Sequence, residues 1–150
     1  MIQRIYLFEE ENEVLLQSEI QIQYGNKGHD IMPLEVVYID DEHDLCEMFS
    51  EAFTTPNVHI TSFIDPNVAL INIASKAPDL IFIDFRLPNI TGDKLALKMN
   101  PKIPKVLITG DLQVKVEAIF DRVFYKPVDF DQVARYLEGC YQMRKNSKTT

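Results

Sequence analysis

Cysteine is scarce in this sequence. Only two occur, Cys46 and Cys140, and neither belongs to a CxxC motif. Their number and spacing exclude a disulfide-rich scaffold and a cysteine-based zinc site. Both fall on apolar stripes of expected helices, so we expect small buried side chains in a protein kept in a reducing cytoplasm.

Long apolar runs and a basic surplus are also missing. No stretch is long enough to span a bilayer, and the N-terminus has no basic start followed by an apolar core, so we predict a soluble cytoplasmic protein with no membrane partner. The formal net charge is -8, and nucleic acid requires a basic face, so we expect no nucleic-acid partner. The basic cluster Arg144, Lys145 and Lys148 is expected to be a solvated, frayed terminus.

Residues 1–33 differ from the rest of the chain. They are strongly acidic, Ile2–Phe8 is a candidate strand, and Glu19–Tyr24 alternates polar and apolar residues as a half-buried strand does. This N-terminal extension is either a β-hairpin or a loosely held linker, and the sequence favours neither. We assign 34–142 to the main domain and 143–150 to a polar tail.

Strand and helix patterns alternate along the main domain. Short apolar runs predict five strands, at about 34–40, 57–62, 79–84, 105–109 and 122–126. The intervening helices predict an α/β fold with a parallel sheet covered on both faces. Pro101 and Pro104 must end a short third helix, and 112–120 is expected to be a short helix or one helical turn.

Helical spacing predicts which residues face the core. Asp65, followed by Pro66, and Asp129 are expected N-caps of the second and last helices. The inward residues are Leu45, Phe49 and Phe53 in the first helix, Ala69, Leu70, Ile73 and Ala74 in the second, and Phe130, Val133, Leu137 and Tyr141 in the last.

Carboxylates follow two of the strands. Asp40 and Asp41 come after the first and Asp84 ends the third, so neighbouring strands would bring all three to one edge of the sheet. Close carboxylates repel one another, and Mg2+ relieves that repulsion with help from a backbone carbonyl such as that of Arg86. The alternative is that Asp40, Asp41 and Glu42 only begin a helix, where negative charge suits the helix dipole.

Thr109 and Lys126 end the last two strands. Asp84 can attack phosphorus and form an aspartyl phosphate, while Lys126 offsets the charge of the transferred group and the Thr109 hydroxyl or nearby backbone N–H groups donate hydrogen bonds to it. Considered alone, Lys126 could be an ordinary surface lysine at a strand end, and the Thr109 hydroxyl could be part of a turn. Their joint placement at strand ends favours phosphoryl chemistry.

This ordered set of motifs resembles the response-regulator receiver domain (CheY-like superfamily) of two-component signalling. The resemblance covers about 34–141 and rests on Val37–Glu42, Leu80–Pro88 with Gly92, Leu107–Gly110 and Tyr125–Pro127. It implies a three-layer, flavodoxin-like α/β/α fold with strand order 2-1-3-4-5, here with shortened helices 3 and 4.

The resemblance also implies a role for each site residue. Asp84 would be the phospho-acceptor, Lys126 the cation that pairs with phosphate and Thr109 the switch hydroxyl, with Mg2+ held by Asp40, Asp41, Asp84 and the Arg86 carbonyl. The donor would be a phosphohistidine on a sensor histidine kinase or phosphotransfer protein. The output would be a changed surface for a downstream protein target or a second copy of the chain. Few residues follow Tyr141, so we expect no output domain here.

The sequence departs from the family at its output side. Val123 stands three residues before Lys126, where the family usually has an aromatic, and 109–126 is short by about one helical turn. We therefore expect a remodelled output surface. Arg86 and Asp111 are either an ion pair across the site mouth or two solvated residues. His43 is expected on a helix surface rather than as a ligand, because Mg2+ disfavours nitrogen.

Two other functions compete with a phosphorylated receiver. A pseudo-receiver acting as a protein-interaction module would explain the missing aromatic and the shortened helix. A phosphatase of the haloacid-dehalogenase type needs a second aspartate two residues after the nucleophile, where this chain has Arg86, which cannot shuttle a proton. We therefore expect no enzyme beyond self-catalysed phosphorylation and autodephosphorylation of Asp84.

Overall fold

The computed structural model describes residues 32–115 and 118–148. The candidate strands Ile2–Phe8 and Glu19–Tyr24, and the choice between hairpin and linker, lie outside the described residues. Within these ranges, no helix combines the length and apolarity needed to cross a membrane.

Five parallel strands form the central sheet, in the order β2-β1-β3-β6-β7. This order equals 2-1-3-4-5 among the five main strands, which confirms the predicted fold class and topology. Each strand ends within one residue of its predicted bounds: β1 is Leu34–Ile39, β2 Val58–Phe63, β3 Leu80–Asp84, β6 Lys105–Thr109 and β7 Arg122–Tyr125.

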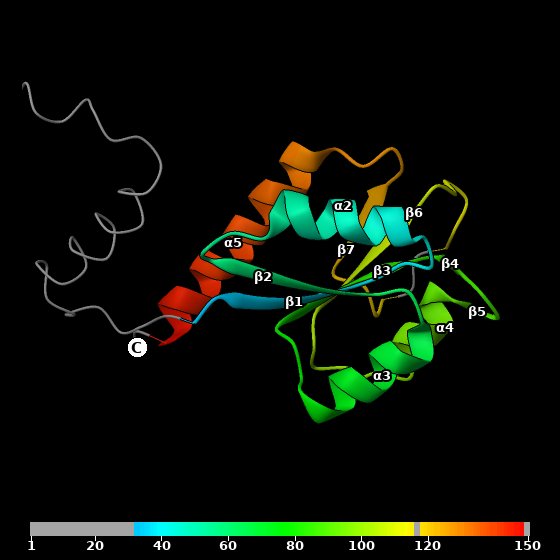
Figure 1. The fold of residues 1–150 in the computed structure, drawn as a ribbon, viewed down its shortest axis with the longest axis horizontal. Helices are drawn as coiled ribbons and strands as arrows, with labels where there is room; N and C mark the ends of the chain where they lie inside the picture. The colour runs from blue at the N-terminus through cyan, green and yellow to red at the C-terminus, as the bar shows by residue number, and fades with distance from the viewer. Residues whose placement is uncertain (1–31, 116–117, 149–150) are drawn as a thin grey trace, which may run out of the picture. The chain divides into compact units, whose positions relative to one another are not determined.

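Two helices cover each face of the sheet (Figure 1). Helices α2 (His43–Phe53) and α5 (Phe130–Lys148) lie on one face, and α3 (Pro66–Ser75) and α4 (Gly92–Ala96) on the other. The expected caps are present, because the Asp65 carboxylate accepts a hydrogen bond from the Asn67 amide and that of Asp129 accepts from the Asp131 amide.

The two faces of the sheet pack differently. Phe82 of β3 lies at the centre of the α2/α5 side, with the rings of Phe49, Phe124 and Tyr136 at centroid distances of 5.2, 6.2 and 6.3 Å. The α3/α4 side is mainly aliphatic and includes Val37, Ile39, Ile73, Ile81, Ile83, Leu95 and Leu107. Strand alternation divides the sequence between these two layers.

Helical periodicity identified most inward residues but erred at helix ends. Ala74, in the last turn of α3, is exposed, and Phe130, in the first turn of α5, is 39% exposed although its ring lies 5.2 Å from that of Phe53. A helix end can project past the sheet, which the spacing of apolar residues does not reveal. Three further residues expected inside are only half-buried: Leu45, Leu70 and Cys140.

The connections around β6 are short. Helix α4 ends at Ala96, before Pro101, and Lys105 holds the loop that follows by donating to the carbonyls of Asn100 and Ile103 at 2.7 and 2.8 Å. Between β6 and β7, the described residues 110–115 and 118–121 form turns rather than a helix. The expected short helix is therefore absent from these described residues, and Leu112 there is 77% exposed.

The structure also contains a small element between β3 and α4, outside the five predicted strands. Strands β4 (Arg86–Leu87) and β5 (Ile90–Thr91) form an antiparallel hairpin directly after Asp84. Asn89 in its turn has a φ of 63°, a left-handed conformation that asparagine tolerates better than most residues.

Arg144 is not part of a frayed tail. Helix α5 continues to Lys148, and Arg144 pairs with the Asp79 carboxylate at 2.8 Å. It also donates to the Pro33 carbonyl at 2.6 Å, with 19% of its side chain exposed. The expectation of a solvated terminus was wrong for this residue, because its guanidinium joins α5 to the start of β1 and to the loop before β3.

We expect Arg144→Ala to lower the free energy of unfolding by about 1–3 kcal/mol, because the Asp79 carboxylate and the Pro33 carbonyl lose a charged donor. Urea denaturation measures the change. The control is Arg135→Ala, which removes an exposed arginine from the same helix and should change stability by less than about 0.5 kcal/mol. Equal stabilities of the two variants would contradict an anchoring role for Arg144.

Candidate functional site

Three carboxylates meet at the carboxyl edge of the sheet. Asp40 follows β1 and Asp84 ends β3, and these strands pair so that Ile39 lies beside Ile83. Asp40 is 0% and Asp84 4% exposed, whereas Asp41 lies on the surface. Oxygen atoms of the three carboxylates lie within 4.8 Å of one another. The predicted acidic group therefore exists.

Lys126 reaches this acidic group from β7, two strands away from β3. Its Nζ lies 2.7 Å from Asp84 Oδ1 and 3.8 Å from Asp40 Oδ2. Its amide donates to the Thr109 carbonyl at 2.9 Å, and the peptide bond to Pro127 is cis. The lysine bridges two buried carboxylates, which does not fit the alternative of a surface lysine.

Burial and charge act together on this pair. Burial raises the pKa of Asp84 above its usual range, the Lys126 hydrogen bond opposes that rise, and the negative charge of Asp40 adds to it. Burial lowers the pKa of Lys126, but the hydrogen bond to Asp84 and the nearby carboxylates more than offset it, so the net shift is upward. Lys126 is therefore a cation that partly neutralises an electron-rich acceptor.

Hydrogen bonds fix the orientation of both buried carboxylates. The Arg86 amide donates to Asp84 Oδ2 at 2.8 Å, and the Glu42 amide donates to Asp40 Oδ1 at 3.0 Å. The Tyr38 hydroxyl donates to Asp40 Oδ2 at 2.7 Å. From the sequence, Tyr38 was expected only as a strand residue. Its spacing of two residues from Asp40 could have predicted the contact, because residues two apart on an extended chain point to the same face.

Thr109 ends β6, the strand between β3 and β7, and is 1% exposed. Its hydroxyl accepts a hydrogen bond from the Asp111 amide at 3.0 Å, which is the turn arrangement weighed for it as the alternative. In the described part of the chain no ion pair joins Arg86 to Asp111. Arg86 is exposed, whereas Asp111 is half-buried and its carboxylate accepts a hydrogen bond from the Gln113 amide at 2.9 Å.

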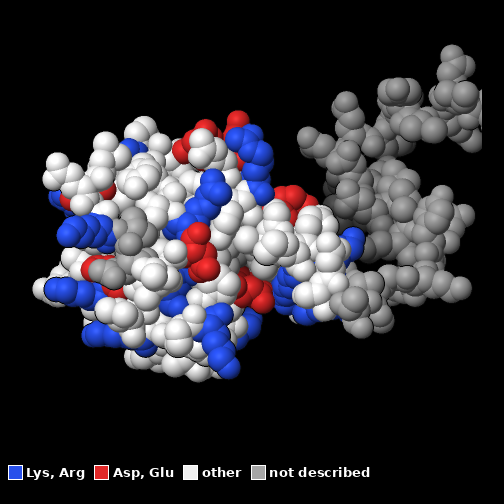
Figure 2. All heavy atoms as spheres, turned by 180° about the vertical axis from the view of Figure 1, so that it is seen from behind, with Lys and Arg blue, Asp and Glu red and all other residues white. Residues whose placement is uncertain are grey.

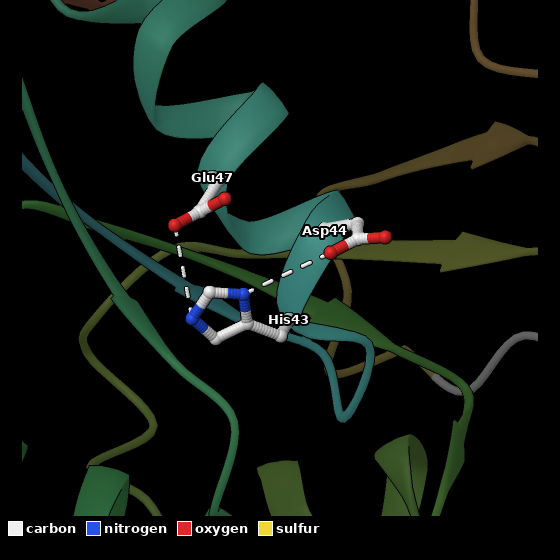
Figure 3. A group of neighbouring side chains, drawn as sticks. All are labelled: His43, Asp44 and Glu47. Atoms are coloured by element: carbon white, nitrogen blue, oxygen red, sulfur yellow. Dashed lines mark ion pairs between the residues drawn. The ribbon is translucent and has the colours of Figure 1, made fainter.

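A second acidic group lies on the first turn of α2 (Figure 3). His43 is flanked by Asp44 at 3.8 Å and Glu47 at 3.7 Å, with 67% of the histidine side chain exposed. His43 is thus a surface residue, as expected, and it groups with these two neighbours rather than with the three aspartates. Exposed ion pairs at such distances contribute little to stability.

The molecular surface fits the low basic content of the chain. On the face shown in Figure 2, lysine and arginine side chains are separated by uncharged and acidic ones.

The donor set at the sheet edge suits a hard divalent cation. Carboxylate oxygens are the side-chain ligands that Mg2+ prefers, and here three lie close together with one ammonium beside them. The loop with the Arg86 carbonyl starts directly after Asp84. The residues present therefore fit Mg2+ together with a bound or transferred anion.

Residues 36–138 match the response regulator receiver domain family, and the chain belongs to that family. It is 31% identical over 129 residues to the probable transcriptional regulatory protein TcrX of Mycobacterium tuberculosis, covering 81% of this chain and 54% of that protein. It is 25% identical over 118 residues to the C4-dicarboxylate transport transcriptional regulatory protein DctD of Rhizobium meliloti, covering 73% of this chain and 26% of that one. The chain thus spans about half and about a quarter of these two relatives.

Solved structures show the same fold. The signal receiver domain of an HD domain-containing protein from Pseudomonas fluorescens Pf-5 superposes with a TM-score of 0.70 at 20% identity, covering 83% of this chain and 98% of that one. A CheY-like receiver domain from Methylobacillus flagellatus gives 0.65 at 20% identity, with coverages of 72% and 98%. The sheet order and helix layers described above are therefore those of a CheY-like receiver.

Gly92 lets α4 begin directly against the backbone of Asp84. A Cβ at this position would lie 2.5 Å from the Asp84 carbonyl oxygen and 3.1 Å from Ile83 Cγ2. The Gly92 amide donates to the Phe85 carbonyl at 2.8 Å, which holds the two segments together.

We expect Gly92→Ala to destabilise the fold by about 1–3 kcal/mol, because the added methyl group must displace the backbone that carries Asp84. Gly139→Ala is the matched control, since nothing lies within 4 Å of its Cβ position on α5. That variant should gain about 0.5–1 kcal/mol from reduced backbone freedom. Chemical denaturation of both separates the effects, and a stabilised Gly92→Ala variant would contradict the close approach.

Proposed function

We propose that this protein is a phosphorelay receiver that accepts a phosphoryl group on Asp84. The observation that carries the proposal is the buried Asp84 carboxylate, which ends β3 with one oxygen 2.7 Å from Lys126 Nζ and the other held by the Arg86 amide. A fixed carboxylate beside a fixed cation is an aimed nucleophile with charge compensation for the incoming anion.

The proposed step transfers phosphorus from nitrogen to oxygen. An Asp84 carboxylate oxygen forms the new P–O bond while the P–N bond of a phosphohistidine breaks. The freed imidazole nitrogen keeps the electron pair and takes a proton. Lys126 balances charge on the phosphoryl oxygens, and Thr109, which follows Ile108, the β6 partner of Asp84, supplies a hydroxyl at the same edge.

Mg2+ is the proposed cofactor. Asp40, Asp41, Asp84 and the Arg86 carbonyl would hold it, and when bound it supplies positive charge to the phosphoryl oxygens. Transfer to Asp84 and later hydrolysis of the acyl phosphate are self-catalysed, so the protein is proposed as a signalling component rather than an enzyme with a separate substrate.

The proposed donor is a phosphohistidine on a sensor histidine kinase or a phosphotransfer protein, in the cytoplasm. The proposed output is a changed contact surface for a downstream protein or a second copy of the chain. The added charge, roughly -1.5 to -2, acts beside the segment 110–115 and its exposed Leu112. This segment forms turns rather than a helix, which supports a remodelled output surface.

A pseudo-receiver that acts only as an interaction module is the second candidate. Val123 in place of an aromatic and the absence of a helix in the described parts of 110–121 favour it. The intact contact between Lys126 and Asp84 favours phosphorylation. The two candidates differ in whether the wild-type protein takes up a phosphoryl group.

Incubation with acetyl phosphate and Mg2+ should add the mass of one phosphoryl group to the intact wild-type protein. Asp84→Asn should abolish this gain, because the amide is a poor nucleophile at phosphorus. Asp131→Asn, which changes an exposed carboxylate on α5, should label as the wild type does. Intact-mass spectrometry reads the result. Labelling of Asp84→Asn would remove Asp84 from its role, and an unlabelled wild type would favour the pseudo-receiver.

Mg2+ binding should weaken about tenfold or more in Asp41→Asn, because one of the three clustered carboxylates is lost. Isothermal titration calorimetry measures the dissociation constant. Glu47→Gln is the control, since it removes a carboxylate from the separate His43 group and should leave Mg2+ affinity unchanged. Equal weakening in both variants would place the cation outside the aspartate cluster.

A further inference from the structure

Tyr38 is a buried tyrosine in the middle of β1, with 3% of its surface exposed. Its neighbours along the strand, Val37 and Ile39, belong to the aliphatic layer on the α3/α4 side. Tyr38 points to the opposite side, where its ring stacks on Phe49 of α2 at a centroid distance of 4.1 Å and an interplanar angle of 16°. Packing alone would be satisfied by a phenylalanine at this position.

The hydroxyl distinguishes Tyr38 from a packing residue. It donates to Asp40 Oδ2 at 2.7 Å, a short hydrogen bond between two fully enclosed groups. Burial and the hydrogen bond to Asp40 both raise the pKa of the Tyr38 phenol above its usual value. Removing it would leave Asp40 Oδ2 with the more distant Lys126 Nζ, at 3.8 Å.

Asp40 is thus held at both oxygens before any cation arrives. The Glu42 amide fixes Oδ1, and the Tyr38 hydroxyl fixes Oδ2 on the side that faces Lys126. A carboxylate with a donor on each oxygen cannot rotate without breaking a hydrogen bond. The stacked ring of Tyr38 in turn cannot move without disturbing Phe49.

We propose that Tyr38 is a positioning residue that orients Asp40 for Mg2+ through its hydroxyl. The inference rests on the proposed function, because it assumes that Asp40 faces the cation. Partners in the layer around a metal ligand typically contribute a factor of about 10 to 100 in metal affinity. Tyr38 is such a partner, since it contacts the Asp40 carboxylate and is shielded from solvent.

The test compares Tyr38→Phe with Tyr141→Phe in the full chain. Tyr141 is a buried tyrosine on α5, 8% exposed and outside the site, so Tyr141→Phe removes a phenol hydroxyl without touching Asp40. Tyr38→Phe should raise the Mg2+ dissociation constant about tenfold by calorimetry. Tyr141→Phe should bind Mg2+ as the wild type does. Equal affinities of Tyr38→Phe and the wild type would overturn the inference while leaving the proposed function intact. Failure of the wild type to bind Mg2+ would overturn both.

A measurement on the wild-type protein covers the case in which Tyr38→Phe does not fold. The phenol carbon of Tyr38 that bears the hydroxyl should shift in the NMR spectrum as Mg2+ is added. The shift should follow the same binding curve as calorimetry, because the hydrogen-bond acceptor changes its charge environment. A resonance that stays still while calorimetry reports binding would overturn the positioning role.

Discussion

The contact between Lys126 and two buried carboxylates is the interaction on which this site depends. Asp40 and Asp84 are almost completely removed from water, and unpaired charges in such a place would be costly. One ammonium compensates both of them, at 2.7 and 3.8 Å, and backbone amides hold the remaining oxygens. The arrangement needs the ends of β1, β3 and β7 at one edge, which the strand order β2-β1-β3-β6-β7 provides.

The packed layers on the two faces of the sheet each contact the site. On the side of the aliphatic layer under α3 and α4, the missing side chain of Gly92 lets α4 begin against the backbone of Asp84. The aromatic layer under α2 and α5 starts at Tyr38, which touches Asp40, and continues through Phe82 and Phe124. It reaches Arg122 at the edge strand, whose guanidinium lies 5.0 Å from the Phe124 ring centroid. The site and the edge of the sheet therefore share one packed layer of rings.

Much of the site could be predicted because its residues follow short, strongly apolar strands. Asp40, Asp84 and Thr109 each stand where a buried apolar strand ends. Parallel strands bring their carboxyl ends to the same edge of the sheet. Tyr38 and the Arg86 amide escaped prediction for different reasons. Tyr38 looks like an ordinary strand residue until a carboxylate is known to share its face, and an amide carries no signal in the sequence. Thr109 was expected at the site or in a turn, and the structure shows the turn, in which its hydroxyl accepts from the Asp111 amide.

The sequence by itself determined the strand positions and the parallel α/β class, because alternation, apolar runs and caps are local properties of the chain. The strand order, and with it the acidic edge, followed from the resemblance of the motifs to a receiver domain. Tertiary structure decided the rest. Arg144 looked like a solvated tail residue, yet it pairs with Asp79 and the Pro33 carbonyl, since only folding brings α5 beside the start of β1. The outward positions of Ala74 and Phe130, in the last turn of α3 and the first turn of α5, did not follow from the spacing of apolar residues. The strand order implied that β6 lies between the strands of Asp84 and Lys126, but the 2.7 Å contact across it was decided by folding, because it joins distant segments that no local pattern relates.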